Sequence, residues 1–220
     1  MSQPSYPVLL HVSDRLCVIV GGGAVAVRKA QGLINAGAQR VRMIAPVFAA
    51  DVPQTVQKLR EPYRSEHLME AGIVFAATDS TEVNDGVVRD AQALRILVCR
   101  VDGEDRLSGD FVNAAYFKNG AVTVAVSAGA PALSVMIRDQ LAARYDPTWT
   151  DLANVMTQLR PEIKQRWNET ARRNIFRDLA TAEALDVLAS GGIEGVRQWI
   201  RRRHGERRGG RHGDGTRAGT

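Results

Sequence analysis

The sequence has few cysteines, few histidines and no long apolar run. Its two cysteines, Cys17 and Cys99, are far apart, and no Cys/His cluster has metal-site spacing, so no metal ligand is predicted. Both thiols are predicted to be buried small side chains without a disulfide. No apolar run approaches the roughly 20 residues that span a bilayer, and the first residues lack a signal-peptide pattern. We therefore expect a cytoplasmic protein with no membrane contact.

Positive charge is concentrated at one end of the chain. The formal net charge of the whole sequence is +5. From Arg197 onward there are eight arginines and two acids, Glu206 and Asp214, so this segment alone carries +6. The rest of the chain is nearly neutral, so no nucleic-acid partner is expected. Residues 205–220 have almost no apolar side chains and are expected to form a disordered basic tail.

The chain is organised around the stretch from Leu16 to Ala30, LCVIVGGGAVAVRKA. A short β-branched run meets three glycines and then helix-forming residues, which is typical of a strand, a tight turn and a helix. The spacing Gly21-x-Gly23-x-x-Ala26 matches the dinucleotide fingerprint, and the helix that follows would direct free N–H groups toward a pyrophosphate. The alternative is a glycine-rich turn that binds nothing.

The next segments complete a βαβ unit. A helix over 25–36 and a strand from Arg40 to Ala45 are predicted, and Pro46 ends the strand. NAD proteins of this type often carry an acid at the end of this strand for the ribose hydroxyls, but none is present here. Arg40 and Arg42 leave binding of a 2′-phosphate, and hence NADP, open.

In the rest of the chain, predicted helices and strands alternate as far as Pro147, and only helices are predicted after it. Residues 51–70 are predicted to begin as a helix and to become irregular around Pro62. The remaining predicted elements are helices over 81–94 and 132–145 and strands over 72–77, 96–99 and 121–127. Asn119-Gly120 predicts a hairpin. After Pro147 the pattern is purely helical. His11 and His67 are expected on the surface.

Polar residues follow two of the predicted strands. Thr78 and Asp79 come after one strand, at the edge where parallel sheets hold ligands, although helix capping explains them equally well. Asp102 follows the next strand and could handle a proton while a hydride leaves for a nicotinamide. The alternative for Asp102 is a solvated turn aspartate before glycine. Arg100 could tune its pKa.

Basic residues recur in the helical half of the chain. These are Arg138, Arg144, Arg160, Lys164, Arg166, Arg172 and Arg173. They could hold a substrate with several carboxylates, because arginine binds carboxylates bidentately. The favoured alternative is a set of solvated helix faces balanced by acids, namely Asp151, Glu162, Glu169 and Asp178.

The motifs together resemble a known family. The matching stretches are YPVLLHVSDRLCVIVGGGAVAVRKAQGLINAGAQRVRMIAP, VFAATDSTEVNDGVV, ILVCRVD, GDFVNAAYFKNGAVTVAVSAGAPALSVMIRDQL and LRPEIKQRW. In this order they are similar to the precorrin-2 dehydrogenase / sirohydrochlorin ferrochelatase family, which is the amino-terminal module of siroheme synthase. The resemblance covers roughly Tyr6 to Arg203.

The resemblance implies NAD-dependent oxidation of precorrin-2 to sirohydrochlorin in siroheme biosynthesis by a homodimer, and in some members insertion of ferrous iron. It implies an α/β fold: a Rossmann-like parallel sheet domain over 1–113, a small α+β dimerisation domain over 114–147 and a helical domain over 148–204. It places the catalytic carboxylate on Asp102. It places cofactor contacts on Gly21, Gly22, Gly23, Ala24, Val25, Ala45, Pro46, Thr78 and Asp79, and substrate contacts on Ser127 and Arg138.

Three positions depart from the family pattern. Arg100 occupies a position where asparagine is usual, and Ala114 one where proline is frequent. The loop before the helix at 132 is shortened to 127–131, and it borders the expected tetrapyrrole cleft. Two alternatives therefore stay open: a non-catalytic NAD-binding sensor or assembly module, and an enzyme acting on another tetrapyrrole.

Overall fold

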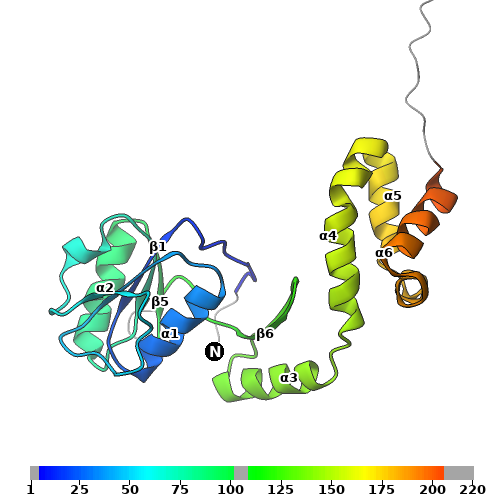
Figure 1. Ribbon diagram of the computed structural model, residues 1–220. Helices are drawn as coiled ribbons and strands as arrows, with labels where there is room; N and C mark the ends of the chain where they lie inside the picture. Colours follow the sequence, from blue (N-terminus) through cyan, green and yellow to red (C-terminus); the bar gives the residue numbers. More distant parts are fainter. Residues whose placement is uncertain (1–4, 102–108, 206–220) are drawn as a thin grey trace, which may run out of the picture. The chain divides into compact units, whose positions relative to one another are not determined.

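The structure is a computed structural model that describes residues 5–101 and 109–205 (Figure 1). Contacts divide the chain into two compact units, Met1–Asn113 and Ala114–Thr220, and each is described by itself. Asp102 and the tail from residue 206 onward lie outside the described residues.

A parallel sheet organises the first unit. Its strands are β1 (Leu16–Val20), β2 (Arg40–Ile44), β3 (Gln57–Leu59), β4 (Ala71–Ala76) and β5 (Leu97–Arg100), in the order β3-β2-β1-β4-β5. The chain builds outward from β1 to β3 and then crosses to the other side of β1. The order reverses between β1 and β4, where open α/β sheets bind ligands beyond the carboxyl ends of the strands. The predicted Rossmann-like sheet is confirmed.

Helices cover both faces of this sheet. Successive strand side chains point to opposite faces, so Cys17 and Ile19 of β1 belong to one core with α1 (Ala24–Asn35). Val18 and Val20 belong to a second core that includes residues of α2 (Thr81–Ala93). No residue of β1 is more than 4% exposed. Burial on both faces explains why β1 is a continuous apolar run rather than an alternating one.

The helix predicted in the first part of 51–70 is wrong, whereas irregular structure around Pro62 is present. The segment contains β3 and a short 3₁₀ turn, η1 (Ser65–Leu68). Pro53 and Pro62 lack the N–H groups that a continuous helix needs. This segment instead adds strand β3 to the sheet, parallel to β2.

His67 is buried rather than on the surface, and this prediction is also wrong. Its side chain is 6% exposed. Nδ1 accepts a hydrogen bond from the Arg64 backbone N–H at 3.1 Å, and Nε2 lies 3.1 Å from Oε1 of Glu61. Both ring nitrogens thus have partners, which a buried imidazole requires.

The second unit begins with the predicted hairpin. Strands β6 (Ala115–Asn119) and β7 (Val122–Val126) are antiparallel, and α3 (Pro131–Ala143) follows them. Ser134 is the only buried residue of α3. The hairpin and α3 therefore leave much apolar surface exposed.

Three helices complete the second unit, as expected for its carboxyl-terminal part. They are α4 (Thr148–Arg166), α5 (Glu169–Leu179) and α6 (Ala182–His204), which share one apolar core. Asn168 and Thr181 cap α5 and α6 through their side chains. Non-helical backbone at Gly192 breaks α6. Among the described residues, no helix combines the length and apolarity needed to cross a bilayer.

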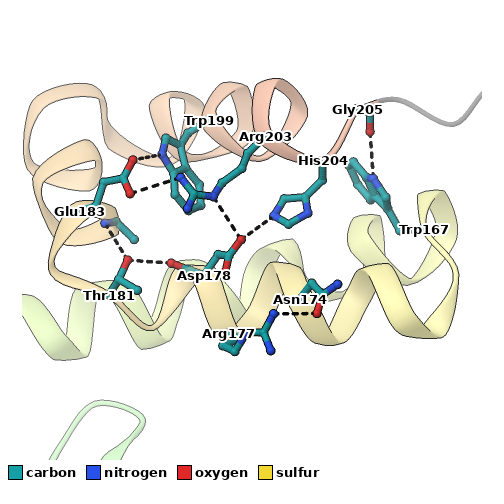
Figure 2. A network of polar contacts seen from close by, with 11 residues as sticks. Trp167, Asn174, Arg177, Asp178, Thr181, Glu183, Trp199, Arg203, His204 and Gly205 are labelled. Carbon is teal, nitrogen blue, oxygen red and sulfur yellow. Dashed lines mark hydrogen bonds and ion pairs between the residues drawn. The ribbon is translucent and has the colours of Figure 1, made fainter.

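Polar contacts join α5 to both ends of α6 (Figure 2). Asp178 lies 3.2 Å from Nε of Arg203 and 3.1 Å from Nε2 of His204. Glu183 accepts the Trp199 indole N–H at 2.9 Å. These contacts fix the last turn of α6.

Candidate functional site

The glycine turn follows β1 and is wedged between the segments that follow β2 and β4. Gly21 has a φ of +138°, and a Cβ there would lie 2.3 Å from the Ala77 carbonyl oxygen. A Cβ on Gly22 would lie 2.0 Å from the Val47 carbonyl oxygen. Both distances are too short for a side chain, so both positions require glycine.

Backbone hydrogen bonds hold this edge together. The Gly21 N–H donates to the Ile44 carbonyl at 2.9 Å, and the Ala49 N–H donates to the Gly22 carbonyl at 2.8 Å. The Ala77 N–H donates to the Val20 carbonyl at 2.8 Å. The predicted cofactor contacts at 21–25, 45–46 and 78–79 therefore meet at the carboxyl edge of the sheet. They lie on both sides of the switch point, the place between β1 and β4 where the strand order reverses.

The amino end of α1 is open. Gly23 is the residue before the helix; it gives no side-chain cap, and the first turn holds no acid. A Cβ on Gly23 would have no atom within 4 Å, and Ala24 and Val25 are exposed. Ala26 is fully buried and lets the helix pack close to the sheet. Uncapped N–H groups at a helix start suit an anion such as a pyrophosphate.

The segment after β4 is fixed by a residue that sequence reasoning missed. Thr78 does not cap α2, because Ser80 does so by accepting the Val83 N–H at 3.3 Å. Thr78 is instead bonded to the buried side chain of Asn84. A signal for Asn84 was present, since it lies three residues before Val87, on the inward face of the predicted helix. Asp79 is exposed and has no polar partner among the described residues.

The segment that carries Asp102 is attached to the sheet on both flanks. Before it, the Val101 N–H donates to the Ala76 carbonyl at 3.0 Å. After it, Asp110 accepts the Val98 N–H at 2.9 Å, and Phe111 contacts Phe75 edge to face at 5.7 Å. The motif Gly109-Asp110-Phe111 is therefore hydrogen-bonded to the edge strand β5. Asp102 itself lies outside the described residues, so its role stays a prediction.

Arg100 has a partner on α2. Its side chain is 3% exposed and forms an ion pair with Asp85. A buried guanidinium needs such a carboxylate. Arg100, which stands where the resembling family usually has asparagine, thus has Asp85 of the same unit as its acidic partner.

The arginines of β2 are committed to other groups. Arg40 lies 3.6 Å from Glu70, and Arg42 donates to Oε1 of Gln57 at 2.9 Å. Arg40 is the first and Arg42 the middle residue of β2, so neither lies at its carboxyl end. They are therefore poorly placed to hold a 2′-phosphate.

The predicted substrate residues Ser127 and Arg138 are not in contact with each other among the described residues. Ser127 is exposed, and Arg138 is bound to neighbouring Asp139 at 2.6 Å. The loop between β7 and α3 is closed by Ser134, which sequence reasoning missed. Its hydroxyl accepts the Ala128 N–H and donates to the Ala130 carbonyl, both at 3.0 Å.

Several basic residues of the helical region are paired with acids. Arg166 lies 3.5 Å from Glu162, and Arg173 lies 2.5 Å from Glu169. Arg160 lies over the Phe176 ring. This agrees with ion-paired helix faces. Arg144, Lys164 and Arg172 have no acidic partner within the part of the chain that the structure describes.

The two cysteines are buried and free, as predicted. Burial raises the pKa of the Cys17 thiol to about 11, against a smaller opposite effect of Arg15. Burial likewise raises the pKa of the Cys99 thiol to about 11, and nearby Lys29 lowers it slightly. Within 5–101 and 109–205, no group of His, Cys, Asp and Glu side chains could hold a metal ion.

Comparisons with known proteins agree with this geometry. A NAD(P)-binding family model matches residues 8–115, and the model of the sirohaem synthase dimerisation region matches residues 148–203. A solved structure named SirC, precorrin-2 dehydrogenase, is similar at a TM-score of 0.70 and 21% identity, covering 90% of this chain and 100% of that one. At this identity the likeness shows a shared fold.

Curated relatives are siroheme synthases. The one from Nitrosospira multiformis is 30% identical over 208 residues, which are 89% of this chain and 43% of the relative. The one from Methylobacillus flagellatus is 33% identical over 177 residues, which are 77% of this chain and 37% of the relative. The chain spans less than half the length of these relatives.

Fold and site define the class: a Rossmann-type NAD(P)-binding protein that also contains a sirohaem synthase dimerisation region. The chain belongs to the siroheme synthase family. The matched dimerisation region is the part expected to be the helical domain, so dimer contacts within 114–147 stay a prediction.

Proposed function

We propose that the chain oxidises precorrin-2 to sirohydrochlorin with NAD, in siroheme biosynthesis. One observation carries this proposal: a single chain combines a glycine turn at the switch point of a parallel sheet with a sirohaem synthase dimerisation region. The names of its relatives and of its structural neighbour support the same reaction.

The carboxyl edge of the sheet fits a dinucleotide. Glycine at 21 and 22 lets the turn pack directly against the backbone of Ala77 and Val47, and the start of α1 offers uncapped N–H groups. We assign the pyrophosphate to 21–25 and the riboses to Ala45, Pro46 and the exposed carboxylate of Asp79. The commitment of Arg40 and Arg42 to other partners favours NAD over NADP.

Bound at this edge, NAD would supply the hydride acceptor for the oxidation of precorrin-2. Loss of a hydride and a proton is a two-electron oxidation, so one NADH and one proton form for each sirohydrochlorin. We assign acceptance of the proton to the carboxylate of Asp102, which follows β5 in the sequence. The described residues on either side of this segment, Val101 and Asp110, are bonded to β4 and β5.

The second unit is proposed to bind the substrate and a second copy of the chain. Leu133, Val135, Met136 and Leu141 of α3 are each more than 40% exposed. Apolar helix surface of this kind is typical of a homodimer interface. Ser127, Arg138 and the unpaired Arg144, Lys164 and Arg172 are proposed contacts for substrate carboxylates.

The test follows absorbance when purified chain is mixed with precorrin-2 and NAD. Formation of sirohydrochlorin with NADH supports the proposal. Binding of NAD without product would indicate the sensor or assembly module instead. Asp102→Ala is expected to bind NAD normally and to lose turnover, and full activity would remove Asp102 from the reaction.

Ferrous iron tests a second reaction of the same site. Some members of the resembling family insert iron into sirohydrochlorin, and Asp102 would then accept the pyrrole protons. Conversion of sirohydrochlorin to siroheme by the chain, above the rate with iron alone, would establish this activity. The cytoplasmic location stays a prediction that cell fractionation tests.

A further inference from the structure

Asn84 is a buried polar residue that its own helix does not need. Its side chain is 0% exposed, in the first turn of α2. The start of α2 is already capped by Ser80. Burying an amide in an apolar core destabilises a protein unless hydrogen bonds compensate. The partners of Asn84 therefore indicate why an amide is present here.

Three hydrogen bonds join the Asn84 side chain to one residue, Thr78. Its Oδ1 accepts the Thr78 N–H at 3.1 Å and the Thr78 hydroxyl at 2.8 Å. Its Nδ2 donates to the Thr78 carbonyl at 3.1 Å. One amide thus satisfies both backbone groups of Thr78, as a neighbouring strand would. The Thr78 hydroxyl in turn accepts the Ser80 N–H at 3.1 Å.

The bound peptide forms one wall of the candidate cofactor site. Thr78 directly follows Ala77, whose carbonyl oxygen occupies the space beside Gly21. A Cβ on Gly21 would also lie 3.3 Å from the Thr78 nitrogen. Any shift of the 77–78 peptide would therefore change the gap between the two sides of the switch point. It would also move the exposed carboxylate of Asp79.

We infer that Asn84 is a positioning residue for the dinucleotide: it holds 77–79 against the glycine turn without touching the ligand. This rests on the proposed function, because it takes NAD as the ligand of that edge. Without the amide, 77–79 would adopt the binding arrangement only part of the time. The measured Kd would rise in proportion, by about tenfold if that arrangement is populated one time in ten.

The experiment measures NAD binding to the full chain by isothermal titration calorimetry. Asn84→Ala is expected to raise the Kd about tenfold. Asn84→Asp keeps two of the three bonds to Thr78 and is expected to fall between wild type and Asn84→Ala. The matched control is Val87→Ala, which removes fully buried atoms from the same helix but leaves Thr78 bound. It is expected to lower the melting temperature and keep the Kd of wild type.

Steady-state kinetics supply a second readout. Asn84→Ala is expected to raise the KM for NAD and to keep kcat at saturating NAD within about twofold. Equal Kd values for wild type and Asn84→Ala would overturn the inference, as would equal rises in Asn84→Ala and Val87→Ala. If Asn84→Ala does not fold, Asn84→Asp decides by the same comparison. Wild type that binds no NAD would instead overturn the proposed function, which separates the two failures.

Discussion

Strand β1 and helix α3 are both rich in apolar residues but differ in burial. No residue of β1 is more than 4% exposed, whereas α3 buries only Ser134 and leaves Met136 49% exposed. The Rossmann unit therefore covers its own central strand from both faces. The hairpin and α3 do not cover themselves. From this comparison we predict that one chain suffices to bind the cofactor, whereas a second copy of the chain covers α3.

The glycine turn gives the largest expected effect in the self-contained unit. Gly22→Ala places a methyl group 2.0 Å from the Val47 carbonyl oxygen, so backbone must move. We expect a loss of about 2–3 kcal/mol in the free energy of unfolding, measured by urea denaturation. Gly23→Ala is the control, because open space surrounds that position; it should cost less than about 1 kcal/mol but weaken NAD binding. Equal stability of the two variants would contradict the packing described here.

A charged residue on α3 tests whether the exposed apolar surface of this helix is the dimer interface. Met136→Glu is expected to weaken dimerisation about 100-fold, because a carboxylate would be buried without a partner. Sedimentation or light scattering measures the dimer Kd. Leu94→Glu, at a residue that is 51% exposed in the Rossmann unit, should leave the Kd unchanged. A Met136→Glu chain that dimerises like wild type would place the interface elsewhere.

The buried ion pair of the first unit should stabilise the fold more than the exposed ion pair of the second unit. Asp85→Asn removes the carboxylate from the buried Asp85–Arg100 pair, and we expect a loss of about 2 kcal/mol in unfolding free energy. Glu169→Gln breaks the exposed pair with Arg173, which should cost less than about 0.5 kcal/mol. Thermal and urea unfolding measure both. Similar losses would show that burial does not decide the strength of these pairs.

The smallest expected effect is opposite pH dependence in the two units. Burial alone would raise the pKa of Glu162, but Arg197, Arg166 and Arg201 outweigh it and lower that pKa. The ionised form is favoured in the fold, so this stabilisation is present at neutral pH and is lost as the pH falls below the ordinary glutamate range. Glu162→Gln should therefore flatten the acid side of the stability profile.

The buried thiols affect the stability of the first unit at alkaline pH. The pKa values of Cys17 and Cys99 are raised from 9.0 to about 11, so the fold favours the protonated thiols. Their contribution is complete below pH 9 and is lost as the pH rises toward 11. A Cys17→Ala, Cys99→Ala chain should lose less stability between pH 9 and 11 than wild type. An unchanged alkaline profile would contradict this assignment.

Sequence reasoning found the parts of the fold that local chemistry determines. The run from Leu16 to Val20, the three glycines and the Asn119-Gly120 turn each predict one conformation, and the structure has it. The segment 51–70 could not be predicted, because its short strand exists only through pairing with β2. His67 and Asn84 were missed or misplaced for a related reason. Their partners are Glu61 and Thr78, and whether a polar residue is buried depends on such partners.

Precorrin-2 oxidation coupled to NADH formation tests the central claim most directly. With wild-type chain, NAD and precorrin-2, the account predicts one NADH for each sirohydrochlorin formed, and both signals should depend on the chain. A chain that is folded and binds NAD, yet forms neither product above the rate without protein, would contradict the account.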